Sequence, residues 1–69
     1  MNRKDVLKKI MRAARAKGLS TEMREGGNHT RLRIGKTATT LGRHNEIHDQ
    51  MARQVFKQLE GELGKGWWK

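Results

Sequence analysis

The chain has 69 residues, and its sixteen Lys and Arg against seven Asp and Glu give a formal charge of +9 and a pI near 11.0. This length allows one small domain, and the absence of cysteine excludes disulfides and thiolate metal sites. No apolar run approaches the ~20 residues of a membrane span, and the basic N-terminus leads into an amphipathic segment rather than a signal sequence. We therefore expect a soluble, cytoplasmic protein with a polyanion as partner, nucleic acid before membrane.

Residues 3–17 have the pattern of an amphipathic helix that Asn2 caps and Gly18 ends. Its apolar stripe, with steps of three and four residues, consists of Val6, Leu7, Ile10, Met11 and Ala14. The opposite face is basic and consists of Lys4, Lys8, Arg12 and Arg15, with Lys9 and Lys17 at its margins. These cations either follow the phosphates of a nucleic acid or are simply solvated, and the pattern leaves both readings open.

Three strands are predicted to follow as a meander. Residues 19–25 alternate in polarity, which is typical of a strand. Gly26-Gly27 predicts a hairpin turn, because glycine reaches positive φ angles without a Cβ penalty, and residues 29–34 form the second strand. Gly35-Lys36 predicts another turn, which leads into residues 37–41, a segment rich in β-branched threonine.

A second helix is expected after a loop at residues 42–45. Its apolar face, again at helical spacing, consists of Ile47, Met51, Ala52, Val55, Phe56 and Leu59. Asn45 and Asp49 are both candidates for the N-cap, and the pattern does not choose between them.

Gly61 is expected to end this second helix. The result is a single domain over residues 1–61 and a glycine-punctuated tail over residues 62–69, which we expect to be mobile unless its tryptophans dock. Trp67 and Trp68 have the ring faces that hold bases in RNA-binding proteins, but docking against protein explains them equally.

The order helix, strand, strand, strand, helix predicts an α+β fold, with a three-stranded antiparallel sheet and both helices on one face. This α-β-β-β-α arrangement is the topology of double-stranded RNA-binding domains. The expected core consists of Val6, Ile10, Met11, Leu32, Ile34, Met51, Val55 and Phe56. The other face of the sheet is then open to solvent.

The second strand carries the strongest indication of chemistry. Because side chains alternate along a strand, His29, Arg31 and Arg33 share the open face. An imidazole has a pKa of about 6.5 and can exchange a proton near neutral pH. Two guanidiniums beside it can hold a phosphodiester and stabilise the added negative charge of its transition state. A solvated surface histidine would show the same pattern, so these residues alone leave catalysis open.

Several segments together resemble the HicA family of toxin endoribonucleases, which are also called mRNA interferases. The resemblance spans about Asp5 to Leu59, and the combination of its motifs is specific although each is weak alone. After the first helix, the matching segments are Arg24-Glu25-Gly26-Gly27-Asn28-His29, Gly42-Arg43-His44-Asn45-Glu46-Ile47 and Ala52-Arg53-Gln54-Val55-Phe56-Lys57-Gln58-Leu59. The chain departs from the family at Leu41-Gly42, where Val-Pro is usual, and at Gln50-Met51, where Gly-Thr is usual.

The resemblance implies a double-stranded-RNA-binding-like fold and cleavage of mRNA without a metal or other cofactor. It implies that His29 is the catalytic residue, held by the turn at Gly26 and Gly27, and that a HicB-type antitoxin covers it. The residues that we expect to contact RNA or to stabilise the transition state are Arg24, Arg31, Arg33, Lys36, Arg43 and His44.

Within that set, Arg31 and Arg33 are the nearest candidates for stabilising the phosphate, with Arg24 and Lys36 less direct. His44 is a second proton carrier only if the loop after the third strand folds beside the catalytic histidine.

Three other functions are open on the sequence. The first is a non-catalytic RNA-binding module of the same fold. The second is DNA binding by residues 50–60, although only Arg53 and Lys57 would face a groove because the apolar positions are needed for packing. The third is a metal site at His44 and His48, which we expect to straddle a helix start rather than to share a helix face.

Overall fold

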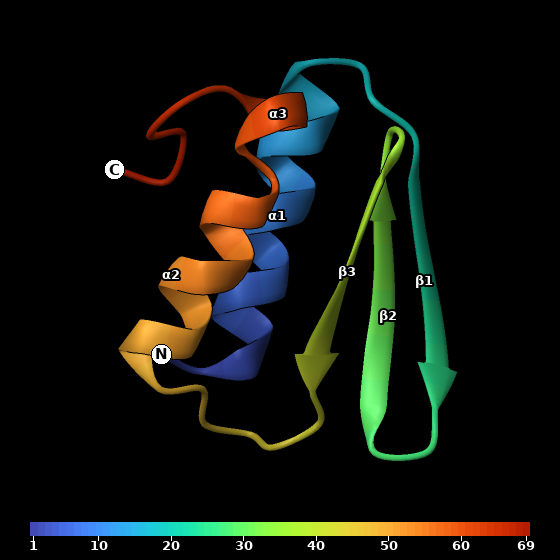
Figure 1. Ribbon diagram of the computed structural model, residues 1–69, viewed down its shortest axis with the longest axis vertical. Coiled ribbons are helices and arrows are strands. Elements are labelled where there is room, and N and C mark those ends of the chain that lie inside the picture. Colours follow the sequence, from blue (N-terminus) through green and yellow to red (C-terminus); the bar gives the residue numbers. More distant parts are fainter.

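The computed structural model describes residues 1–69 and shows helices packed on one face of a three-stranded antiparallel sheet (Figure 1). In chain order the elements are α1 (Arg3–Ala16), β1 (Thr21–Gly26), β2 (His29–Ile34), β3 (Thr37–Gly42), α2 (Asp49–Gln58) and α3 (Glu60–Leu63). The sheet order is β1-β2-β3. The predicted α+β class and the α-β-β-β-α order are confirmed, with α3 as a short addition. No helix has the length and apolar character that crossing a membrane requires.

The helix α1 begins and ends where local signals predict. The Asn2 side chain accepts a hydrogen bond from the Lys4 backbone N–H at 2.8 Å. This N–H is in the first turn of the helix and has no acceptor within the helix. Gly18 follows the helix with a φ of 67°, a conformation that favours glycine. The basic side chains of α1 face solvent except that of Arg3, which is half-buried, while the apolar stripe faces the sheet.

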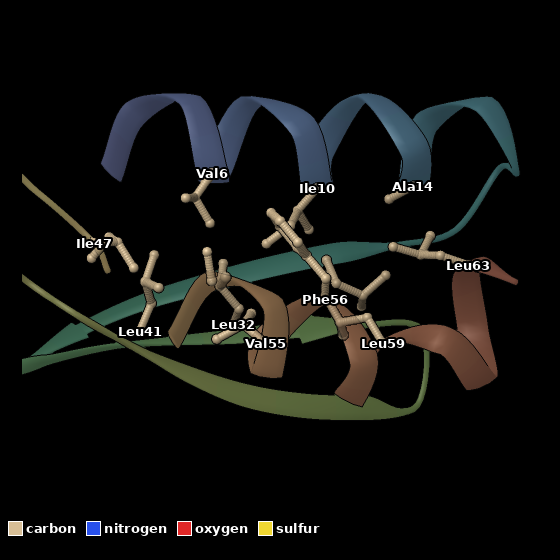
Figure 2. Packing of buried hydrophobic residues seen from close by; sticks show 12 residues of the cluster. Val6, Ile10, Ala14, Leu32, Leu41, Ile47, Val55, Phe56, Leu59 and Leu63 are labelled. Atoms are coloured by element: carbon tan, nitrogen blue, oxygen red, sulfur yellow. The ribbon is translucent and has the colours of Figure 1, made fainter. Parts of the chain in front are cut away.

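The core lies between α1, the C-terminal helices and the inner face of the sheet (Figure 2). Its twelve apolar residues are Val6, Ile10, Ala14, Leu32, Ile34, Leu41, Ile47, Ala52, Val55, Phe56, Leu59 and Leu63. Two predicted core residues differ. Met11 is only half-buried, and Met51 is 54% exposed, because it lies at the margin of an apolar stripe that is centred on Ala52, Val55 and Phe56.

The strand β1 lies at the edge of the sheet, furthest from the helices (Figure 1). All six of its residues are exposed, and Met23 is 50% exposed although it faces the helix side. In contrast, β2 alternates strictly between exposed and buried residues. The helices therefore cover β2 and β3 and leave β1 largely uncovered.

The loop before α2 is held in an extended form by the N-terminal residues. The Ile47 N–H donates to the Met1 carbonyl at 2.7 Å, and the Arg3 N–H donates to the Asn45 carbonyl at 2.8 Å. These backbone groups are therefore not free to form helical hydrogen bonds. As a result α2 begins only at Asp49.

The predicted N-caps of the second helix, Asn45 and Asp49, are both wrong. His48 occupies the N-cap position and makes no side-chain capping hydrogen bond. Ile47 is buried as predicted but lies in the extended loop before the helix rather than on its face.

The prediction that Gly61 ends the second helix is also wrong. Gly61 lies inside α3, where the Leu63 N–H donates to the Leu59 carbonyl at 2.8 Å. This additional turn buries Leu63, whose exposure is 2%, and the chain leaves the helix at Gly64 with a φ of 98°. Burial of a leucine on the core outweighs the low helix propensity of one glycine.

The C-terminal segment after α3 docks through its tryptophans. The Trp67 indole N–H donates to the Phe56 carbonyl at 2.8 Å, and its ring meets the Phe56 ring edge-on with centroids 5.1 Å apart. Trp68 stacks against the same phenylalanine at 5.9 Å. We expected residues 62–69 to be mobile unless their tryptophans dock. The tryptophans do dock, so the packed domain extends past residue 61.

Candidate active site

His29 begins β2 on the face of the sheet that the helices leave open, and its nearest cross-strand neighbours have no side chains. It pairs with Gly26 on β1 and with Gly42 on β3. Directly paired residues of an antiparallel sheet project to the same face, so glycine on both sides leaves space around the imidazole. We refer to Gly26, His29 and Gly42 as the histidine row.

The turn before His29 is one residue later than predicted. Gly26 is the last residue of β1, and the two turn residues are Gly27 and Asn28. Gly27 has a φ of 23°, which agrees with a role for glycine in the turn. The shift places Gly26 beside the imidazole rather than in the turn.

His44 lies at the same end of the sheet as His29. A Cβ added to Gly42 would lie 3.8 Å from Cδ2 of His44, so the His44 ring lies next to the residue that pairs with His29. Both imidazoles are exposed. The loop after β3 therefore brings His44 next to the histidine row, and its role as a second proton carrier stays a prediction.

Arginines form the row next to the histidine row. Arg24 on β1 pairs directly with Arg31 on β2, and both are two residues from the histidine row, about 6.7 Å along a strand. Arg33 is two residues further, about 13 Å from His29 along β2. The predicted order, with Arg31 and Arg33 nearest, is therefore corrected: the hairpin register makes Arg24 a closer neighbour than Arg33.

The arginines enclose a shallow hollow of about 320 Å³ on the open face, lined by Glu22, Arg24, Arg31, Arg33 and Ala38. One carboxylate thus accompanies three guanidiniums. The Glu22 and Arg24 side chains approach to 3.9 Å but are 60% and 82% exposed, so solvent screens this pair strongly. The hollow keeps an excess of positive charge that suits a phosphate.

Lys36 is not brought to this site. It follows the far end of β2, and its backbone N–H donates to Oε1 of Glu62 at 2.9 Å. The length of β2, about 17 Å, separates it from His29.

Arg43 is bonded to the turn before His29, and its expected contact with RNA stays a prediction. Its Nε lies 3.1 Å from Oε2 of Glu25, and its Nη1 donates to the Gly27 carbonyl at 3.0 Å. Glu25 Oε1 accepts a hydrogen bond from the Thr30 hydroxyl at 2.8 Å, and Arg3 donates to both Glu25 and Thr30. This cluster ties the turn before His29 to α1 and to the loop that carries His44.

The same cluster perturbs the acidity of Glu25. The hydrogen bond from Thr30, together with the charges of Arg43 and Arg3, outweighs desolvation and lowers the pKa of the Glu25 carboxyl. The roles of Glu25, Thr30 and Arg3 were not predicted from the sequence. One signal was available, because a two-residue turn at Gly27-Asn28 places Glu25 directly opposite Thr30.

No group of three or more His, Cys, Asp or Glu side chains is placed to hold a metal ion. Comparison with models of known protein families, with curated proteins and with solved structures finds no match to this chain.

Proposed function

We propose that this protein is the toxin of a type II toxin-antitoxin pair and a metal-independent endoribonuclease that cleaves mRNA, with His29 as its catalytic residue. The observation that carries the proposal is the histidine row beside the arginine pair: an imidazole that pairs with a glycine on each side lies two residues along the strands from Arg24 and Arg31. The resemblance of the Glu25–His29 and Gly42–Ile47 segments to HicA toxins supports the same activity.

The proposed reaction uses the 2′-hydroxyl of the RNA as nucleophile. Its oxygen attacks the adjacent phosphorus, the 2′ proton passes to a base, and the bond from phosphorus to the 5′ oxygen breaks as that oxygen takes a proton. The products are a 2′,3′-cyclic phosphate and a 5′-hydroxyl. His29 supplies the base or the acid, His44 is the candidate for the other role, and Arg24 and Arg31 stabilise the charge on the pentavalent phosphate.

The proposal includes a protein partner and a cytoplasmic site of action. A HicB-type antitoxin would neutralise the toxin by covering His29 and the arginine pair. Because this face is basic, we expect the antitoxin to present carboxylates to it.

The test is incubation of wild type, His29→Ala and His48→Ala with a long single-stranded RNA in EDTA, followed by analysis of the new ends. His48 is an exposed histidine at the N-cap of α2 without a side-chain capping bond, so its substitution is a matched control. We expect wild type and His48→Ala to produce cyclic-phosphate ends. We expect His29→Ala to lose cleavage, with an unchanged circular dichroism spectrum and similar RNA affinity.

Cleavage by His29→Ala at the wild-type rate would remove His29 from the reaction. If no protein cleaves while all bind RNA in a salt-sensitive manner, the second candidate takes precedence: a non-catalytic RNA-binding module. The basic hollow on the open face favours that candidate, since binding needs only positive charge there.

A further inference from the structure

A groove of about 510 Å³ lies on the helix side of the molecule, between α1 and the docked C-terminal segment. In Figure 1 this segment lies beside the helices, on the side away from the sheet. His29 and the arginine pair project from the opposite, open face of the sheet. The groove is therefore separate from the candidate active site.

One wall of the groove is Trp67. The indole N–H is already bonded to the Phe56 carbonyl, and the ring packs against Phe56, which together hold the side chain in place. What the indole offers to the groove is therefore apolar ring surface. Across from it, α1 contributes Ala13 and Ala16, whose short side chains leave room for a flat ring beside the indole.

The other wall is cationic. Lys8, Lys9 and Arg12 line the groove from one side of α1, all three are exposed, and none makes an ion pair. Asp5 is the one acidic side chain that lines it. Residues three and four apart on a helix are neighbours, so Arg12 lies close to both lysines.

An immobilised aromatic ring beside several unpaired cations is the arrangement with which proteins hold single-stranded nucleic acid: a base packs on the ring and the backbone phosphates lie on the cations. We propose that this groove is a second binding site for single-stranded RNA, with a base against Trp67 and phosphates on Lys8, Lys9 and Arg12. A duplex does not fit this reading, because its bases are stacked on one another and have no free face for the indole.

The test measures binding of a labelled oligouridylate as a function of salt, in the full chain carrying His29→Ala so that RNA stays intact. The groove variant is Lys9→Gln with Arg12→Gln. Its matched control is Lys4→Gln with Arg15→Gln, which removes the same charge from exposed positions of α1 outside the groove. The groove variant lacks two cations that would neutralise phosphates. The negative slope of its log affinity against log salt should therefore become shallower by about 1.4, while the slope of the control stays unchanged.

Tryptophan fluorescence gives a second readout. With Trp68→Phe the remaining Trp67 should be quenched by the oligonucleotide, whereas with Trp67→Phe the remaining Trp68 should respond much less. Equal salt slopes for both charge variants would show general attraction to a basic protein and overturn the proposal. Absence of Trp67 quenching would also overturn it. None of these readouts depends on cleavage, so failure of the proposed function remains distinguishable.

Discussion

At the scale of single residues, Glu25 is the point through which the neighbourhood of His29 is held together. Its carboxylate joins the β1–β2 hairpin, the start of α1 and the loop after β3 through Thr30, Arg3 and Arg43. Each of these contacts is partly exposed and individually weak. Their shared acceptor is what positions the turn, since Arg43 also bonds the Gly27 carbonyl.

The lowered pKa of Glu25 predicts a pH dependence of stability. Because the folded-state pKa lies below the ordinary value of 4.5, ionised Glu25 stabilises the fold above that value, and this stabilisation is lost as pH falls through the folded-state pKa. Glu25→Gln should therefore lower the melting temperature at neutral pH and make it less sensitive to acid. Thermal unfolding followed by circular dichroism at neutral and acidic pH measures both effects.

The matched control is Glu22→Gln, which removes the same charge from the opposite face of β1, where Glu22 forms only an exposed pair with Arg24. Little change in melting temperature is expected there. Equal acid sensitivity of wild type and Glu25→Gln would show that the cluster around Glu25 does not contribute to stability.

At the scale of elements, α3 forms because of burial and against the low helix propensity of Gly61. Gly61 is a helix breaker by local preference, yet α3 continues through it because Leu63 reaches the core on the following turn. Gly64, which has a φ of 98°, then ends the helix and leads the chain toward the docking position of Trp67.

Alanine substitutions distinguish the glycine inside α3, Gly61, from the glycine that ends it, Gly64. A Cβ at Gly61 would meet nothing within 4 Å, and glycine inside a helix costs about 0.5–1 kcal/mol relative to alanine. Gly61→Ala should therefore raise the free energy of unfolding by about that amount, measured by urea denaturation. Gly64→Ala should lower it by about 1 kcal/mol or more, because its φ is strained for any side chain. A loss of stability in Gly61→Ala would contradict its place inside α3.

At the scale of the whole molecule, a thin core supports two exposed basic surfaces. Twelve apolar residues form the core of a 69-residue chain that has no cysteine, so we expect a net stability of only a few kcal/mol. The open sheet face and the α1 groove both remain uncovered, and their cations repel one another across the small domain. Binding of a polyanion on either face would relieve that repulsion.

Because the expected net stability is small, truncation of one core side chain should remove a large part of it. Leu59 is fully buried, and Leu59→Ala should cost about 2–5 kcal/mol, which is comparable to the whole stability of the domain. Met51→Ala in α2 is the control and should change stability by less than about 0.5 kcal/mol, because Met51 is mostly exposed. Urea denaturation of both variants measures the difference, and similar losses would contradict the assignment of Met51 to the surface.

Features that depend on neighbours a few residues apart can be predicted from the amino-acid sequence. The cap at Asn2, the stripe of α1, the alternation of β2 and the exposure of His29 all follow from local hydrogen bonds and from the periods of helix and strand. The same local reasoning predicted the α+β order, because short turns between alternating segments leave few arrangements.

Strand register, the start of α2 and the order of the C-terminal segment depend on contacts between residues far apart in the chain, and they become visible only in the folded molecule. The register of three strands placed Gly42 beside His29 and brought Arg24 nearer than Arg33. Pairing of residues 45–47 with residues 1–3 delayed the start of α2. Burial of Leu63 and docking of Trp67 on Phe56 ordered the chain beyond Gly61, since the apolar surface that they cover belongs to residues far away in the sequence.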